Sequence, residues 1–180
     1  MAIAVPVAER STPDSEHCNG VITPPPDDEA EDFYSWTLWY LNDQRDKSWE
    51  KRLKMVETFS TVEEFWALYL NIKTPSMLPS ACDYNVFKKD IQPMWEVPEN
   101  SKGGRWLVTI DKSRHHELLD LIWLEVLLAV IGEQFGEYTK DICGVVVNIR
   151  NKGSKVSITS VIESFRDNPT MFWHFYSSFE

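Results

Sequence analysis

The sequence predicts an α+β domain preceded by a polar tail, and three observations lead to this prediction. Short segments of alternating apolar and polar residues, rich in β-branched and aromatic side chains, indicate strands. Two longer segments repeat apolar residues at helical spacing. Residues 1–32 instead combine eight acidic residues, one base and a run of three prolines with almost no large apolar residues, which is typical of a solvated tail. We expect the folded body to begin at Phe33.

Five segments of this body are predicted to be strands: 35–41, 83–89, 105–111, 144–149 and 155–159. The first is followed by a polar loop over residues 42–49, in which Trp49 has no apolar neighbours in the sequence. The last two strands are separated by a short turn that contains Gly153, so we expect them to form a hairpin. The tip of this hairpin gathers the bases Arg150, Lys152 and Lys155.

Two helices are expected. The first begins at Ser60 or Thr61, because these residues form potential capping boxes with Glu63 and Glu64. Its apolar residues span roughly 200° of the helix surface, which is wider than the roughly 100° that usually faces a core, so part of this helix is expected to face another protein. The second covers residues 113–135 and is apolar nearly all round, which predicts either packing on both sides or one face presented to a partner.

Composition and charge exclude several classes of protein. A length of 180 residues with 43% hydrophobic and 26% charged residues suits one globular domain. No stretch approaches the roughly 18 uninterrupted apolar residues of a membrane span, and the first ten residues do not resemble a secretory signal. The net charge is −10, with −7 in residues 1–32 and −3 in the rest, so broad coating of nucleic acid is not expected. Three scattered cysteines favour a reducing compartment.

No enzyme signature is present. The sequence lacks the G-x-G-x-x-G, G-x-x-x-x-G-K-[ST], G-x-S-x-G and H-E-x-x-H motifs. The adjacent His115 and His116 cannot share one helical face, and nothing else completes a set of metal ligands. We therefore expect no enzyme activity, no metal and no cofactor.

The eight tryptophans fall into groups with different expected roles. Trp49 and Trp95 lie in polar, loop-like surroundings, and Trp95 is followed by Glu96. Two facing indoles can hold a flat cation between them, with each desolvated contact worth about 2 kcal/mol or more. A neighbouring carboxylate can accept two N–H groups from a guanine edge, and the hairpin bases can bind phosphates. The alternative interpretation is that both indoles only cover the edge of the domain. Four further tryptophans are predicted to belong to the core or the sheet: Trp36, Trp39, Trp106 and Trp123.

Six motifs occur in one order along the chain: TLWYL followed by Trp49, TVEEFWALY (61–69), DIQPMWE (90–96), KGGRWLV (102–108), WLEVLLAVIGE (123–133) and CGVVVNIRNKGSKVSI (143–158). Together they resemble the eukaryotic translation initiation factor 4E family, whose members bind the 7-methylguanosine cap of messenger RNA. The resemblance implies a strongly curved antiparallel sheet with helices on its convex face and the cap site on its concave face. It divides the chain into a tail (1–32), a cap-binding domain (33–159) and a C-terminal segment (160–180).

The resemblance also implies roles for particular residues. Trp49 and Trp95 would stack on the cap and Glu96 would read its guanine. The phosphates would be bound by Arg150 and Lys155, with Arg105 and Lys152 as supporting charges. Methylation at N7 gives the purine a positive charge. If this adds about 2–4 kcal/mol over both indole faces, the methylated base is preferred by roughly 30- to 700-fold.

A second implied site lies on the convex side and binds protein partners. Initiation factor 4G and 4E-binding proteins would dock a helix with a Tyr-x-x-x-x-Leu-Φ motif on five residues: Val62, Trp66, Glu125, Leu128 and Ile131. Leu70 would enlarge this apolar surface. The resemblance further implies a monomer within a larger complex, in the cytoplasm and also in the nucleus, with no membrane partner.

Two parts of the sequence depart from the family pattern. AEDFYSW (30–36) stands where the family has a His-Pro-Leu segment that helps to dock partners. Thr159 takes the place of a tryptophan that contacts the cap, and residues 160–180 are rich in aromatic residues and match neither the expected helix nor the last strand. Two functions therefore remain open. The chain is either a cap-binding initiation factor or an isoform impaired in cap binding that sequesters 4G-type and 4E-binding-protein partners.

Overall fold

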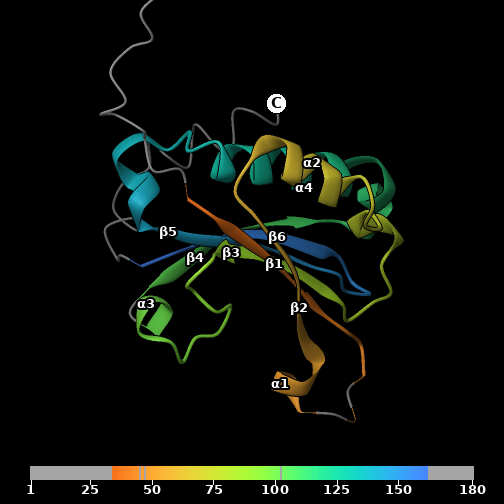
Figure 1. Cartoon of the computed structure of the whole chain (residues 1–180). Coiled ribbons are helices and arrows are strands. Elements are labelled where there is room, and N and C mark those ends of the chain that lie inside the picture. Colours follow the sequence, from red (N-terminus) through yellow and green to blue (C-terminus); the bar gives the residue numbers. More distant parts are fainter. Residues whose placement is uncertain (1–33, 45, 47, 102, 162–180) are drawn as a thin grey trace, which may run out of the picture. The chain divides into compact units, whose positions relative to one another are not determined.

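The structure is a computed structural model that describes residues 34–161 except 45, 47 and 102 (Figure 1). The chain divides into two units, 1–32 and 33–180, and all described residues belong to the second. The predicted tail and the aromatic-rich segment beyond residue 161 lie outside the described residues, as do the side chains of His115 and His116.

Six strands form one antiparallel sheet in the order β2-β1-β3-β5-β6-β4. Their bounds are β1 Trp36–Leu41, β2 Leu53–Phe59, β3 Asp83–Lys88, β4 Gly104–Ile110, β5 Ile142–Asn148 and β6 Ser154–Ser160. The five predicted strands are confirmed, with their ends shifted by one or two residues. The sheet register shifts at Leu38/Trp39 in β1 and at Ile142/Gly144 in β5, and such bulges bend a sheet and increase its twist.

β2 was not predicted from the sequence. Across its pairing with β1, Glu57 lies opposite Leu38 and Met55 lies opposite Trp39, which leaves Val56 without a partner. An extra residue interrupts the strict alternation of faces that marks a strand in the sequence. The bulge therefore shapes the sheet and also conceals the strand.

Helices lie on both faces of the sheet (Figure 1). On one face are α2 (Val62–Tyr69) and α4 (His115–Ile131); on the other are the short helices α1 (Trp49–Arg52) and α3 (Pro98–Ser101). Single-turn and two-turn 3-10 helices complete the described elements: η1 Pro75–Met77, η2 Lys112–Arg114 and η3 Gly136–Asp141.

The ends of α2 and α4 refine the sequence predictions. Thr61, and not Ser60, is the N-cap of α2: its hydroxyl accepts from the Glu64 backbone N–H at 3.2 Å, and the Glu64 carboxylate accepts from the Thr61 backbone N–H. α4 is shorter than the predicted 113–135, because the 3-10 helix η2 precedes it and Glu133 after it has a left-handed φ of +54°.

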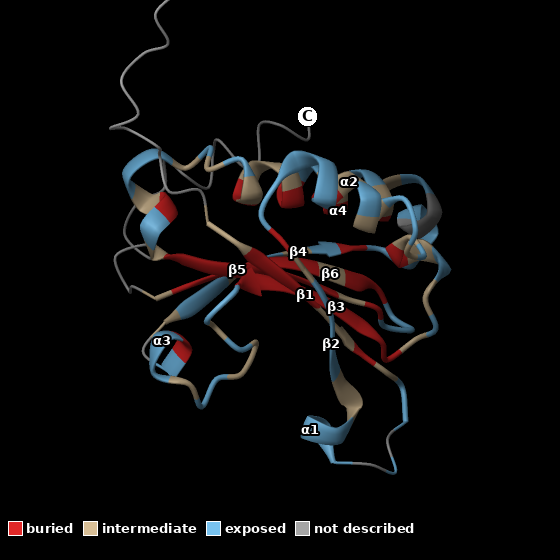
Figure 2. Cartoon of the chain, in the orientation of Figure 1, coloured by how far each residue is buried: buried red, intermediate tan, exposed pale blue. Residues whose placement is uncertain are grey.

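The core lies between the sheet and the helices α2 and α4 (Figure 2). Alternate residues of the central strands, such as Tyr84, Val86, Val145 and Val147, point into it and are buried. Trp36 and Trp123 belong to this core, as predicted, and Trp106 packs against it half-buried. The residues between these core positions face the other side of the sheet, where α1 and α3 lie.

Candidate functional site

The face of the sheet opposite the core forms the floor of a cleft of about 470 Å³, a volume suited to a small ligand. Strand register sets the residues of this floor in rows. One row crosses β1, β3, β5 and β6 through Leu41, Asp83, Asn148 and Lys155. A second row crosses β3, β5, β6 and β4 through Phe87, Gly144, Thr159 and Arg105. All of these residues except Gly144 line the cleft.

Gly144 lets the second row pack closely. A Cβ at this position would lie 2.5 Å from the Phe87 ring and 2.5 Å from the Val86 carbonyl oxygen. Phe87 lines the cleft, so the absence of a side chain at Gly144 keeps the ring close against the sheet. The floor of the cleft therefore depends on a glycine in β5, a strand that pairs with β3 on one side and β6 on the other.

Two exposed indoles flank the cleft. Trp49 is the first residue of α1 and is 37% exposed, and Trp95 lies in the segment before α3 and is 49% exposed. Both line the cleft, and α1 and α3 lie on the same side of the sheet (Figure 1). Single exposed apolar side chains are common on protein surfaces, but two indoles that line the same cleft are not scattered, so their shared position favours ligand binding over the edge-covering role left open by the sequence.

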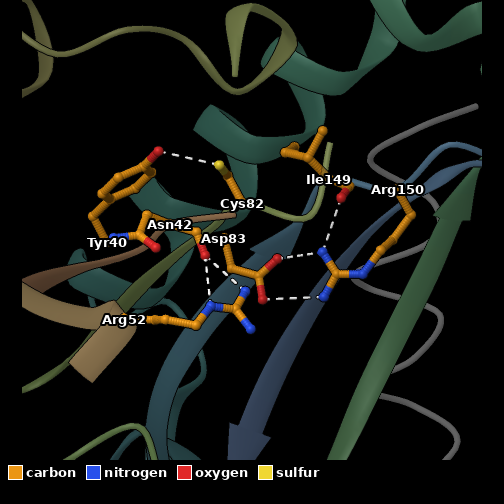
Figure 3. Close-up of polar contacts among 7 residues, drawn as sticks. All are labelled: Tyr40, Asn42, Arg52, Cys82, Asp83, Ile149 and Arg150. Carbon is orange, nitrogen blue, oxygen red and sulfur yellow. Dashed lines mark hydrogen bonds and ion pairs between the residues drawn. The ribbon is translucent and has the colours of Figure 1, made fainter. Parts of the chain in front are cut away.

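The loop before Trp49 is tied to the end of β1. The Arg52 guanidinium donates to the Asn42 carbonyl oxygen through Nε at 2.9 Å and through Nη2 at 2.7 Å (Figure 3). The backbone N–H of Asn42 in turn donates to the Arg52 carbonyl. These bonds close the ends of the loop on each other. They hold α1, and with it Trp49, at the end of the sheet.

The Arg150 guanidinium is held by Asp83 at the start of β3. Its Nη1 and Nη2 donate to the two carboxylate oxygens at 2.5 and 3.1 Å, and Nη1 also donates to the Ile149 carbonyl (Figure 3). The hydrogen bonds to Asp83 raise the pKa of Arg150 above its usual range, against the desolvation that lowers it. A guanidinium fixed in this way loses less freedom when it binds an anion.

The charges on the cleft differ in sign from those of the whole chain. Its lining includes three bases, Arg105, Arg150 and Lys155, against two acids, Asp83 and Glu96, although the chain carries −10. Asp83 is engaged with Arg150, so Glu96 beside Trp95 is the acid without a described ion pair. The Arg105 guanidinium carbon lies 6.0 Å from the Trp95 ring centroid. The cleft therefore combines indole faces, a carboxylate and cationic groups.

The structure brings most of the predicted ligand-binding residues together. Six line the cleft: Trp49, Trp95, Glu96, Arg105, Arg150 and Lys155. Lys152 is exposed in the turn between β5 and β6 and is not among the lining residues, so its role stays a prediction. Lining residues that the sequence reading missed include Asp83, Asn85, Asn100 and Asn148. The alternation within DYNVFK (83–88) was a signal for Asp83 and Asn85, because side chains alternate along a strand and these two point to the face away from Tyr84 and Val86.

The residues predicted to bind a protein partner lie on α2 and α4, on the face of the sheet opposite the cleft (Figure 2). Val62 is 68% exposed and Glu125 is also exposed, whereas Trp66, Leu128 and Ile131 are half-buried against the core. Leu70, at the end of α2, is 74% exposed. The wide apolar surface predicted for the first helix is thus partly open to solvent.

The part of the chain that the structure describes contains no group of three or more His, Cys, Asp or Glu side chains that could hold a metal ion. None of its helices is long and apolar enough to cross a membrane. Cys82 and Cys143 are buried and free, and burial raises the pKa of the Cys143 thiol to about 11. A thiol with this pKa stays protonated at neutral pH and is therefore a poor nucleophile.

Comparison with known proteins identifies the family. A family model described as Eukaryotic initiation factor 4E matches residues 33–168. The chain belongs to this family. It is 64% identical to eukaryotic translation initiation factor 4E-1 of Caenorhabditis elegans over 124 residues, which are 69% of this chain and 58% of that protein. It is 48% identical to human eukaryotic translation initiation factor 4E over 123 residues, 68% of this chain and 57% of the human protein. The chain thus spans somewhat less than three fifths of the length of these relatives.

Solved structures of initiation factor 4E proteins share the fold. Ascaris suum eIF4E-3 in complex with the m2,2,7G cap matches with a TM-score of 0.73 and 51% identity, over 74% of each chain. C. elegans eIF4E-3 in complex with the 4E-binding protein Mextli matches with a TM-score of 0.71 and 50% identity, over 74% of this chain and 76% of that one. The predicted α+β fold with a curved antiparallel sheet is confirmed. The predicted loss of a C-terminal helix and strand concerns residues outside those described.

Proposed function

We propose that the cleft binds the 7-methylguanosine cap of messenger RNA and that the chain recruits capped RNA to translation initiation through a 4G-type scaffold. The observation that carries the proposal is that Trp49 and Trp95, both well exposed, line one cleft together with Glu96 and three bases. The solved complexes of the Ascaris suum relative with m7G and m2,2,7G caps support it. Membership of a family of initiation factors supports the expectation that the function is binding and not catalysis.

The chemistry of the cleft fits each part of a cap. N7 methylation spreads a positive charge over the purine, and the negative faces of two indoles attract a flat cation more strongly than a neutral base. The Glu96 carboxylate can accept the two N–H groups on the guanine edge, a charge-assisted pair that adenine cannot offer. Arg150, pre-oriented by Asp83, takes the phosphates together with Lys155, and Arg105 adds positive charge beside Trp95.

The partner site is proposed for the opposite face. The exposed Val62 and the half-buried Trp66 on α2, with Glu125, Leu128 and Ile131 on α4, suit the apolar face of a helix with a Tyr-x-x-x-x-Leu-Φ motif. Solved complexes of C. elegans eIF4E-3 with Mextli and of a schistosome eIF4E with m7GpppA and 4E-BP support this use of the fold. We further propose a monomer within a larger complex, in the cytoplasm and also in the nucleus.

A second candidate function is an interaction protein that sequesters 4G-type or 4E-binding-protein partners while binding caps poorly. The observation that favours it is Thr159, which lines the cleft with a small side chain where the family resemblance implies a tryptophan. The partner surface on α2 and α4 does not depend on this residue. Both functions therefore predict binding of a partner helix, and cap affinity separates them.

The deciding experiment is the quenching of intrinsic tryptophan fluorescence by 7-methyl-GTP, with GTP as the control and the m2,2,7 trimethylated nucleotide as a third ligand. Saturable quenching in the micromolar range or below, with GTP far weaker, is expected for a working cap site. The trimethylated ligand tests whether this chain accepts the second cap found with its relative. A folded protein that binds a Tyr-x-x-x-x-Leu-Φ peptide but shows no selective quenching would establish the second function.

A further inference from the structure

Asn100 is a buried amide in α3 that is tied to the loop carrying Trp95 and Glu96. It is 2% exposed, and its Nδ2 donates to the carbonyl oxygen of Gln92 at 2.9 Å and to that of Met94 at 2.7 Å. One side chain thus binds the backbone on both sides of Pro93, directly before Trp95. Asn100 itself lines the cleft, and α3 lies beside that loop on the cleft side of the sheet (Figure 1).

The orientation of this amide is determined by its surroundings. Both Nδ2 hydrogens are used, whereas Oδ1 is buried without a hydrogen-bond partner. The opposite orientation would place the oxygen against two carbonyl oxygens and leave two donors unpaired. An unpaired buried acceptor is unfavourable, and leucine, of similar size, would avoid it. The amide at this position therefore contributes to the loop and not to the apolar packing of the domain.

The parts of the cleft are held by different elements. Trp49 depends on α1 and the bonds between Arg52 and Asn42, and the phosphate-binding bases lie on or beside the strands β4, β5 and β6. Trp95 and Glu96, by contrast, are exposed residues of a loop with little burial of its own. If such a loop were not already ordered, ligand binding would have to order it, and the conformational entropy lost would lower the affinity.

We propose that Asn100 is a positioning residue that pre-orders the loop 92–96 and so sets the discrimination between methylated and unmethylated guanine. The inference rests on the proposed cap function. Without the two hydrogen bonds from Asn100, the loop and the indole of Trp95 are no longer held in one position before the ligand binds. Binding of the methylated base, which depends on both indoles, weakens. Binding of the phosphates, which depends on the strands, does not.

The test compares Asn100→Ala with Ser101→Ala, a matched control on the same short helix. Ser101 is exposed, and its hydroxyl donates to the Pro98 carbonyl within α3 and not to the loop. Calorimetric titration of Asn100→Ala is expected to give roughly 5- to 100-fold weaker binding of 7-methyl-GTP, the equivalent of two hydrogen bonds. Affinity for GTP is expected to fall by less than about threefold, and Ser101→Ala to change neither ligand. Equal weakening of both ligands would overturn the proposal, because it would indicate a general structural defect.

A second measurement reports on the loop without any ligand. In spectra of protein labelled with ¹⁵N in the indole groups, Trp95→Phe identifies the Trp95 signal. Asn100→Ala is expected to shift or broaden that signal and to leave the signals of Trp36 and Trp123 in place. If Asn100→Ala does not fold, Asn100→Leu keeps the volume and replaces it in both measurements. An unchanged Trp95 signal overturns the proposal even if the wild-type chain binds no cap, so failure of the positioning role and failure of the cap function are distinguishable.

Discussion

Replacement of Trp95 by leucine removes one indole face from the cleft and keeps an apolar side chain there. A desolvated cation–π contact is worth about 2 kcal/mol, so affinity for 7-methyl-GTP should fall about 30-fold. GTP lacks the positive charge and should lose much less, which narrows the ratio between the two affinities. Trp95 is 49% exposed, so its replacement should change the free energy of unfolding by less than about 1 kcal/mol.

The assay is calorimetric titration, because a tryptophan variant alters the fluorescence signal itself. Trp49→Leu, which removes the other indole of the cleft, should give a similar loss. Trp66→Ala in α2, on the core side of the sheet, is the control that should leave the affinities for both nucleotides unaffected. The reasoning would be refuted if Trp95→Leu lowered the affinities for 7-methyl-GTP and GTP by the same factor. It would also be refuted if Trp66→Ala reduced cap affinity as strongly as Trp95→Leu.

Three further predictions concern the partner surface, a buried thiol and a strand contact. Trp66→Ala should abolish binding of a Tyr-x-x-x-x-Leu-Φ peptide, measured by fluorescence anisotropy, and persistent binding would mean that the peptide docks elsewhere. The pKa of Cys143 is raised by burial from 9.0 to about 11, so the folded state keeps a proton that the unfolded state loses. The contribution of the protonated Cys143 thiol to the free energy of unfolding is therefore complete below about pH 9, and this free energy decreases by about 2 kcal/mol as the pH rises to about 11. Cys143→Ala should reduce this decrease in urea titrations at about pH 8 and about pH 10.5, and equal decreases in both proteins would contradict it. Gly144→Ala places a Cβ 2.5 Å from the Phe87 ring and should lower stability by about 1–3 kcal/mol, visible as a lower melting temperature. An unchanged melting temperature would show that the two strands can move apart there.

Local patterns predicted most of the elements that build the site. Alternating β-branched segments marked β5 and β6, and their turn at Gly153, with φ of +140°, is a conformation that glycine adopts readily. The capping box marked the start of α2, although the choice of Thr61 over Ser60 needed the structure. β2 was missed because the bulge at Val56 depends on its pairing with β1, which the sequence of one strand does not contain.

The candidate site divides in the same way. Trp49 and Trp95 could be found from the sequence because a tryptophan with polar neighbours is unusual, and Glu96 could be found because it follows Trp95. The alternation of β3 could place Asp83 on this face of the sheet but could not reveal its pairing with Arg150, and nothing in the sequence marks Asn100, because an acid at the start of a strand and an amide in a short helix are ordinary residues by themselves. Their roles arise from partners far along the chain or across a loop: Arg150 for Asp83, and the carbonyls of Gln92 and Met94 for Asn100.

The sequence alone determined which residue types were available: exposed indoles, a carboxylate beside one of them, a basic hairpin and a helix with too wide an apolar surface. Only the tertiary structure decided which of them meet. Antiparallel register places Asp83, Asn148 and Lys155 in one row, although 65 residues separate Asp83 from Asn148. The same register places Lys155 among the residues that line the cleft, whereas Lys152 in the turn is not one of them. The physical reason is that periodicity is a property of one segment, whereas a binding site depends on the pairing and packing of several.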